Sequence, residues 1–371
     1  MRYLVILLTA ACFMTAGSAE SGPSPSPVKV EIVKTERGYQ LLRGGEPYTV
    51  RGAGMGVDDI ERFASHGGNS IRTWSTTRPQ QDTRALLDAA QAHGVSVALG
   101  LAMMPERHGF DYDDRKAVAA QLESMRAEVL KYRDHPALLL WVIGNELNHH
   151  YTNPRVYDAV NAVAKMIHEL DPNHPTTTTT SGYKPEVNAE ILARAPALDF
   201  ISFQMYASLF DLRDRLAETG YDAPFMVTEW GAIGWWEMDQ TDWGVPFETT
   251  SSEKADAFQR ALSDVLIPLE GQLIGSYAFF WGQKQERTPT WFGMLTEDGD
   301  LTEVVDAMQY SWTGEWPENR TPRVNALRLD GKGKHVACGE AFAPERTDSF
   351  SCGCWFLADS ESKRGVVFSK F

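Results

Sequence analysis

Eight short apolar segments that alternate with segments of helical periodicity constrain the fold of this 371-residue chain more than any other feature. The segment 138–143 shows no alternation of polar and apolar residues, so both of its faces should be covered. Strands of this kind are typical of a parallel sheet wrapped by helices. The eight predicted strands are residues 48–54, 69–74, 95–101, 138–146, 176–180, 199–206, 225–231 and 274–281.

The segments between these strands favour helices. Residues 83–93 place apolar side chains three and four positions apart and are followed by Gly94, a typical helix stop. Similar patterns cover residues 115–132, 155–170 and 253–269. Eight strands that alternate with helices, with connections long enough for right-handed crossovers, predict an α/β fold of the closed (β/α)8 TIM barrel type.

The main competitor of a barrel is an open, doubly wound sheet, which usually has a glycine-rich phosphate-binding turn after its first strand. Gly52, Gly54 and Gly56 repeat at every second position instead of following the G-x-G-x-x-G spacing. No acidic residue follows a second strand at the required place, so nucleotide binding is disfavoured. The run of five threonines at 176–180 falls where a fifth strand is due, and threonine is a good strand former.

The N-terminus is typical of a secretory signal peptide. Residues 1–19 begin with one early positive charge, continue with an apolar stretch too short to span a bilayer, and end in small residues. We therefore expect a secreted or periplasmic protein without a membrane span. A lipid anchor at Cys12 is the alternative, although Thr9 stands where lipidation favours a large aliphatic residue.

Shorter segments flank the predicted barrel. A small hairpin over residues 29–34 and 39–43 should plug the N-terminal end of the barrel. The C-terminal segment is polar and lacks sustained periodicity, so we assign it no activity. The predicted layout is a signal peptide over 1–19, a proline-rich linker over 20–28, the barrel domain over 29–316, and an irregular tail or truncated accessory module over 317–371.

The composition restricts the partners of the chain. Its 35 Lys and Arg residues against 50 Asp and Glu give a net charge of −15, which repels nucleic acid and anionic membrane surfaces. A neutral or cationic partner fits better. No cysteine lies between Cys12 and Cys338, so we expect the barrel to fold without disulfides. Cys338, Cys352 and Cys354 leave any pairing in the tail unassigned.

Two glutamates end predicted strands. Glu146 follows the sequence Trp-Val-Ile-Gly-Asn on the fourth strand, and Glu229 lies within Val-Thr-Glu-Trp-Gly on the seventh. These strands lie on opposite sides of a small barrel, so the two carboxylates should face each other across its C-terminal mouth, where barrel enzymes place their chemistry. Cleavage of a glycosidic bond uses such a pair, and retention of configuration requires them about 5 to 5.5 Å apart. We predict Glu146 as the acid/base and Glu229 as the nucleophile.

Four residues at neighbouring strand ends fit supporting roles. Asn145 can hold the 2-hydroxyl of a sugar, a contact that strengthens in the transition state. Arg72 can hydrogen-bond the nucleophile and keep it ionised, although strand-end arginines also serve barrel closure. Tyr206 can donate its hydroxyl to the same carboxylate. Trp281 offers a flat apolar floor for a pyranose ring.

The motifs at residues 141–146 and 227–231 together resemble the catalytic barrel of glycoside hydrolase clan A, most closely glycoside hydrolase family 2. Fungal-type β-1,3-glucanosyltransferases are another likeness. The resemblance extends over roughly residues 45–315. It implies a retaining β-glycosidase that needs no metal and no other cofactor. Family 2 enzymes typically carry a jelly-roll and a sandwich domain before the barrel, and the short N-terminal segment here leads us to expect an open cleft that accepts polysaccharides.

Further residues near the predicted mouth are candidate substrate contacts. Trp235 and Trp236 follow the seventh strand and Trp74 follows the second, and their flat faces suit the C–H surface of a sugar ring, although loop packing explains each equally well. His149 is a candidate for contact with the substrate. His149 and His150 are not expected to bind a metal, because adjacent histidines on a helix point apart and no H-E-x-x-H motif accompanies them.

The sequence thus predicts a secreted, retaining β-glycan hydrolase whose partner is an oligo- or polysaccharide. β-Glucan is the favoured substrate class, including its β-1,3-linked form. A transglycosylase, in which an acceptor sugar replaces water, is the alternative within enzymes. A catalytically inactive carbohydrate-binding barrel is the alternative from another class, and it would be expected to lack one of the two glutamates.

Overall fold

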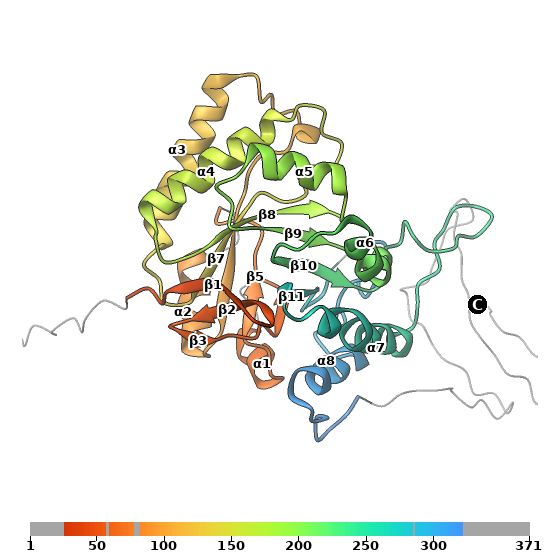
Figure 1. The fold of residues 1–371 in the computed structure, drawn as a ribbon. Coiled ribbons are helices and arrows are strands. Elements are labelled where there is room, and N and C mark those ends of the chain that lie inside the picture. The colour runs from red at the N-terminus through yellow and green to blue at the C-terminus, as the bar shows by residue number, and fades with distance from the viewer. Residues whose placement is uncertain (1–25, 57–58, 78–81, 285, 322–371) are drawn as a thin grey trace, which may run out of the picture.

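Eight parallel strands close into a barrel in the computed structural model, which describes residues 26–56, 59–77, 82–284 and 286–321 (Figure 1). This arrangement confirms the predicted fold. Each barrel strand pairs with the strands that precede and follow it in sequence, and the last pairs with the first. The strands are β4 (Gly52–Gly54), β5 (Ser70–Arg72), β6 (Ser96–Leu101), β7 (Leu138–Ile143), β8 (Thr176–Ser181), β9 (Phe200–Gln204), β10 (Phe225–Gly231) and β11 (Leu273–Phe279).

An α-helix follows every barrel strand and packs on the outside of the barrel (Figure 1). The longer helices are α2 (Thr83–Ala92), α3 (Arg115–Tyr132), α4 (Arg155–Leu170), α5 (Pro185–Arg194), α7 (Ser251–Arg260) and α8 (Glu303–Thr313). The shorter helices are α1 (Ile60–Ser65) and α6 (Leu212–Thr219), with helical turns η1 (Glu106–His108), η2 (Ala207–Asp211), η3 (Ala261–Leu266) and η4 (Ile267–Leu269).

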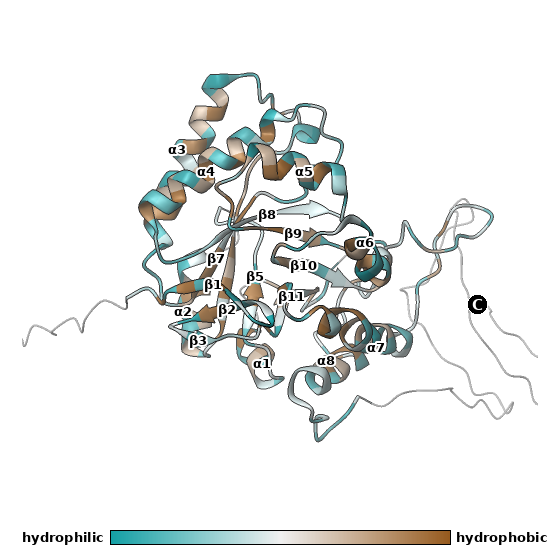
Figure 2. Cartoon of the chain, in the orientation of Figure 1, coloured by the Kyte–Doolittle hydropathy of each residue, from teal (hydrophilic) through white to brown (hydrophobic). Residues whose placement is uncertain are grey.

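The apolar strand β7 shows why both faces of the sheet had to be covered. All six of its residues are buried. Trp141 and Ile143 pack in the large cluster that the strands share with the helices, whereas Leu140 and Val142 pack in a second cluster with the N-terminal hairpin. Figure 2 shows β7 in brown along its length and the threonine-rich β8 much paler. The threonine run nevertheless forms a barrel strand, as predicted.

An antiparallel sheet of β1 (Val30–Thr35), β2 (Gly38–Arg43) and β3 (Glu46–Pro47) contains the predicted hairpin. It contacts segments that lie just before β7, β8 and β11, so it covers the N-terminal end of the barrel, as expected. The opposite end is left for the site. The contacts are hydrogen bonds from Val30 N to Asn173 O at 2.8 Å, from Tyr39 N to Gly271 O at 2.6 Å, and from the Arg43 guanidinium to Pro136 O at 2.7 Å.

The strand ends differ from the prediction where the site is built. β7 ends at Ile143 instead of continuing to Glu146, and β9 ends at Gln204. Glu146 and Tyr206 therefore lie in the turns beyond their strands. Among the described residues, no helix is both long and apolar enough to cross a membrane. The predicted signal peptide and most of the predicted tail, including its three cysteines, lie outside the described residues.

Gly100 allows the end of β5 to approach β6 closely. A Cβ atom at Gly100 would lie 2.5 Å from Thr73 O and from the carbonyl carbon of Trp74, so Gly100→Ala must displace backbone next to the site. We expect the free energy of unfolding to fall by about 1–3 kcal/mol, the usual cost of overpacking, as measured by urea denaturation. Gly56→Ala is the control, because no atom lies within 4 Å of a Cβ there. Equal effects of the two changes would contradict this prediction.

Candidate active site

The turn after β7 positions Glu146. Gly144 adopts a left-handed conformation at φ 72°, and Glu146 does so at φ 48°, a region that residues other than glycine seldom occupy. Glu146 N donates to Thr179 O at 3.1 Å. The Arg107 guanidinium donates to Glu146 O. These backbone contacts hold an unusual turn, which is the behaviour expected where a side chain must point in a fixed direction.

Glu229 lies within β10 and is only 7% exposed. Arg72 forms a buried ion pair with its Oε1. Trp74 Nε1 and Gln204 Nε2 donate to the same oxygen at 2.7 and 2.9 Å, and Tyr206 donates its hydroxyl to Oε2 at 3.0 Å. Burial and the negative charge of Glu229 raise the pKa of Tyr206 well above its usual value, so its hydroxyl keeps its proton. Four donors around one carboxylate form the environment of an anion.

Asn145 is linked to Glu229 through shared donors. Arg72 Nη2 and Gln204 Nε2 donate to Asn145 Oδ1 at 2.6 and 2.7 Å. The Arg72 guanidinium is fully buried and lies 4.7 Å from the centre of the Trp74 ring. With its oxygen occupied, Asn145 has its amide N–H groups left to offer to a ligand.

Glu146 has a different environment from Glu229. Burial and the negative charge of Glu229 raise the pKa of Glu146 to about 7, while Arg107, Arg72 and a hydrogen bond with Ser181 act in the opposite direction. A carboxyl group that keeps its proton near neutral pH can act as an acid, and one surrounded by donors can act as a nucleophile. The two glutamates therefore differ in the way that the predicted pair requires.

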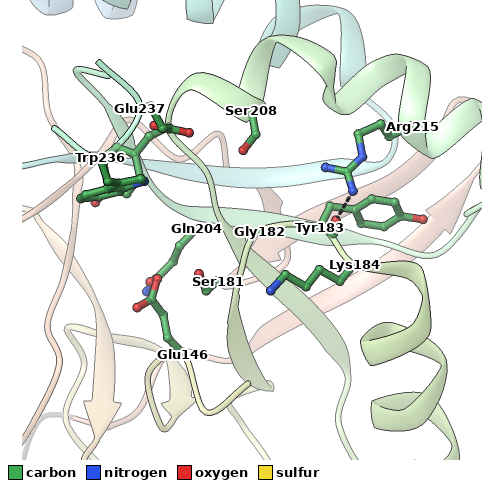
Figure 3. A pocket seen from close by; sticks show the side chains of 11 residues that line it. Glu146, Ser181, Gly182, Tyr183, Lys184, Gln204, Ser208, Arg215, Trp236 and Glu237 are labelled. Carbon is green, nitrogen blue, oxygen red and sulfur yellow. Dashed lines mark hydrogen bonds between the residues drawn. The ribbon is translucent and has the colours of Figure 1, made fainter. Parts of the chain in front are cut away.

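A pocket of about 240 Å³ opens beside Glu146 (Figure 3). Gln204 and Tyr206, which both donate hydrogen bonds to Glu229, also line this pocket. Trp236 is 50% exposed at the opposite wall, and its ring meets Tyr206 edge to face with the centroids 5.5 Å apart. The pocket is lined by Glu146, Ser181, Gly182, Tyr183, Lys184, Gln204, Tyr206, Ser208, Arg215, Trp236 and Glu237.

The remaining aromatic candidates differ in how close they lie to the two glutamates and the pocket. Trp74 contacts Glu229 directly, and Trp236 lines the pocket. Trp235 does not line it; its ring meets that of Trp236 edge to face with the centroids 5.4 Å apart, and the Arg287 guanidinium lies 4.0 Å from its centre. As a platform for a sugar ring, Trp236 is therefore better placed than Trp235.

The prediction for Trp281 is wrong. Its side chain is 1% exposed, and its ring lies 5.2 Å from Phe63 of α1 and 5.8 Å from His66, on the helical side of the barrel. The rings of Phe279 and Phe280 lie near the site instead, each 5.8 Å from the Trp74 ring. Trp281 lies two residues beyond the end of β11, so the strand pattern did not determine the direction of its side chain.

His149 is exposed on the rim, close to His150. The two rings were expected to point apart on a helix. No helix forms here, and the ring centroids are 4.2 Å apart. Burial, followed by the charges of His150, Arg107 and Lys184, lowers the pKa of His149. In the described part of the chain, no three His, Cys, Asp or Glu side chains are grouped so that they could hold a metal ion.

Two residues of the site were missed in the sequence. Gln204 joins Asn145 to Glu229 from the last position of β9, and a signal existed, because the C-terminal ends of barrel strands are where such sites are built. Arg107 supports the turn at Glu146 from η1, an irregular segment without periodicity. Nothing in the sequence pattern indicated its role.

Comparison with known proteins identifies the family to which the barrel is similar. Residues 81–234 match the model of the glycosyl hydrolases family 2 TIM barrel domain, which confirms the resemblance predicted from the two strand-end motifs. The chain is 24% identical to mannan endo-1,4-beta-mannosidase F of Aspergillus clavatus, and the match covers 60% of each protein. The chain thus spans less than two thirds of that relative.

Several solved structures share the fold. A beta-D-glucuronidase from Dictyoglomus thermophilum has a TM-score of 0.60 at 19% identity, and the match covers 78% of this chain and 54% of the other. A Bifidobacterium dentium beta-glucuronidase complexed with coumarin-3-O-glucuronide has a TM-score of 0.60 at 18% identity, covering 77% and 49%. A GH2 beta-galacturonidase from Eisenbergiella tayi has a TM-score of 0.59 at 17% identity, covering 78% and 55%.

Proposed function

We propose that this glycoside hydrolase family 2 barrel is a retaining β-glycosidase that cleaves a β-linked glycan. One observation carries the proposal: Glu229 is surrounded by four donors, while Glu146 across the mouth has a pKa raised to about 7. An inactive carbohydrate-binding barrel would not need two carboxyl groups in such different surroundings.

The proposed reaction has two displacements. Glu229 attacks the anomeric carbon as Glu146 gives its proton to the glycosidic oxygen, so the C–O bond breaks and a glycosyl-enzyme forms. Glu146 then removes a proton from water, which attacks the same carbon and releases Glu229. Two inversions retain the β configuration. Asn145 would bind the 2-hydroxyl through its amide, and Tyr206 would orient the nucleophile through the hydrogen bond already present.

The favoured substrate class is β-glucan, and mannan is the second candidate because a similar protein is a mannan endo-mannosidase. Incubation with laminarin, mannan, cellulose, xylan and aryl β-glycosides, with product sizes recorded, tests both. Products longer than the substrate would identify transglycosylation, which shares the first step. No cleavage of any β-linked substrate would overturn the proposed function.

We also propose that the protein is exported through residues 1–19, on the basis of their charge, apolar stretch and small-residue end. The N-terminal sequence of the protein recovered from an expressing bacterium tests this. A new N-terminus close to residue 20 is expected, and a lipid-modified Cys12 would support the anchored alternative.

The pH dependence should report the pKa of Glu146. This group must be protonated to act as the acid, so kcat/KM should fall as pH rises through about 7, the pKa of the folded protein. A 2,4-dinitrophenyl glycoside needs no proton for departure of its leaving group, so the alkaline decline should weaken with that substrate. An equal decline with both kinds of substrate would contradict the assignment.

A further inference from the structure

Lys184 and Arg215 line one wall of the pocket beside Glu146. Lys184 precedes α5 and Arg215 lies on α6, so two separate βα units bring their side chains to the same place. Figure 3 shows both on the side of Tyr183, across the pocket from Trp236 and Glu237. This wall therefore carries positive charge in a protein whose net charge is −15.

Lys184 and Arg215 differ from the paired cations of the protein. In the described part of the chain, no ion pair joins Lys184 or Arg215 to an acidic side chain, whereas Lys254 is paired with Glu248 at 2.5 Å. Arg215 is held in place by Tyr183, because one guanidinium N–H donates to Tyr183 O at 2.6 Å and the group lies 5.7 Å from the Tyr183 ring. A fixed guanidinium and an exposed ammonium form a binding site for an anionic group.

Neighbouring groups strengthen the positive potential at this wall. The charges of Arg107 and Lys184 both act on His149, after burial and His150, to lower its pKa. The only carboxylate besides Glu146 among the residues lining the pocket is Glu237. It accepts hydrogen bonds from Ala207 N and Gly234 N, each at 3.1 Å, so its charge is engaged by its own loop.

The position of this wall indicates which part of the substrate it contacts. The pocket borders Glu146, the proposed acid, and of the groups that donate to Glu229 it includes Gln204 and Tyr206 but not Arg72 or Trp74. The acid protonates the leaving oxygen, so the space next to it receives the leaving part of the substrate. Lys184 and Arg215 are therefore placed to meet the leaving-group sugar.

We propose that Lys184 and Arg215 form a subsite that selects a leaving-group sugar bearing an anionic substituent, a carboxylate or a sulfate. This inference rests on the proposed function and changes the expected substrate, because the net charge alone favours neutral or cationic partners. The acidic protein would thus accept an acidic glycan through a local cationic wall.

The test compares laminarin with laminarin partly oxidised at C6 to glucuronate and with sulfated laminarin. The wild-type protein is expected to cleave at least one anionic form with kcat/KM about tenfold above that of laminarin, and the preference should shrink at 0.5 M salt. Lys184→Gln should reduce the preference severalfold, Lys184→Arg should preserve it, and Lys165→Gln, which removes an exposed cation on α4, should leave it unchanged. Arg215→Lys, compared with Arg215→Gln, tests the second cation while retaining or removing its charge.

Sequencing the products of partly oxidised laminarin tests on which side of the cleaved bond the anionic sugar binds. The new non-reducing ends should be enriched in glucuronate relative to the new reducing ends, because the leaving sugar occupies the cationic wall. Equal cleavage of neutral and anionic substrates, or no change in Lys184→Gln, would overturn the subsite. If no form is cleaved, the proposed function fails, and equilibrium binding of the three glycans to the wild-type protein and to Lys184→Gln still decides the inference.

Discussion

Glu229→Ala is expected to reduce turnover by on the order of 10⁴-fold or more, because it removes the carboxylate that forms the glycosyl-enzyme. Added azide can occupy the space left by the carboxylate and attack the anomeric carbon of an activated aryl β-glycoside. The product should be the α-glycosyl azide, since one displacement inverts the configuration. Turnover is measured with and without azide, and the product anomer is assigned by NMR.

Two controls separate chemistry from folding in that experiment. Glu229→Ala leaves Arg72 buried without its partner, a change that can cost about 3–5 kcal/mol of stability. Glu229→Gln retains an acceptor for the donors and should fold while remaining inactive. Glu218→Ala removes an exposed carboxylate from α6 and should keep full activity. Near-normal activity in Glu229→Gln would remove Glu229 from the mechanism.

Glu146→Ala should give an effect that depends on the leaving group. Substrates with a poor leaving group need the proton of Glu146, so their kcat/KM should fall by about 10²- to 10⁴-fold. A 2,4-dinitrophenyl glycoside should react normally in the first step and stall in the second, where Glu146 activates water. A rapid burst of dinitrophenol followed by slow turnover is therefore expected in stopped-flow measurements.

The burst also distinguishes Glu146 from a residue that only supports the fold. A variant damaged in structure would lose both steps and show no burst. Glu146→Gln should behave like Glu146→Ala, because an amide is far too weak an acid to give up a proton to the leaving oxygen. A uniform loss of kcat/KM across leaving groups of different pKa would contradict the role of Glu146 as the acid.

Much of the barrel could be predicted because burial on both faces leaves a strong pattern. The apolar run at Leu138–Ile143 and the threonine run at β8 each fall where a strand lies, and the order of strands places Glu146 and Glu229 across the same mouth. Helices and strands depend on local periodicity, which the sequence carries directly. The fold and the strand positions of the two glutamates could therefore be predicted from the sequence.

Features that depend on the exact direction of a side chain were harder to predict from the sequence. Trp281 was chosen although β11 ends at Phe279, and beyond the end of a strand the alternation of faces no longer indicates where a side chain points. Gln204, the last residue of β9, was not recognised as a second donor to Glu229 and Asn145. Lys184 and Arg215 meet only because β8 and β9 are adjacent, and their separation of 31 residues gives no local signal.

The stereochemical outcome of the reaction tests the proposed mechanism most directly. Proton NMR of the first sugar released, recorded before mutarotation, distinguishes the two anomers at the newly formed reducing end. Two displacements through Glu229 predict that the β-anomer appears first and the α-anomer grows later. Initial release of the α-anomer would show a single displacement and would contradict the assignment of Glu229 as the nucleophile.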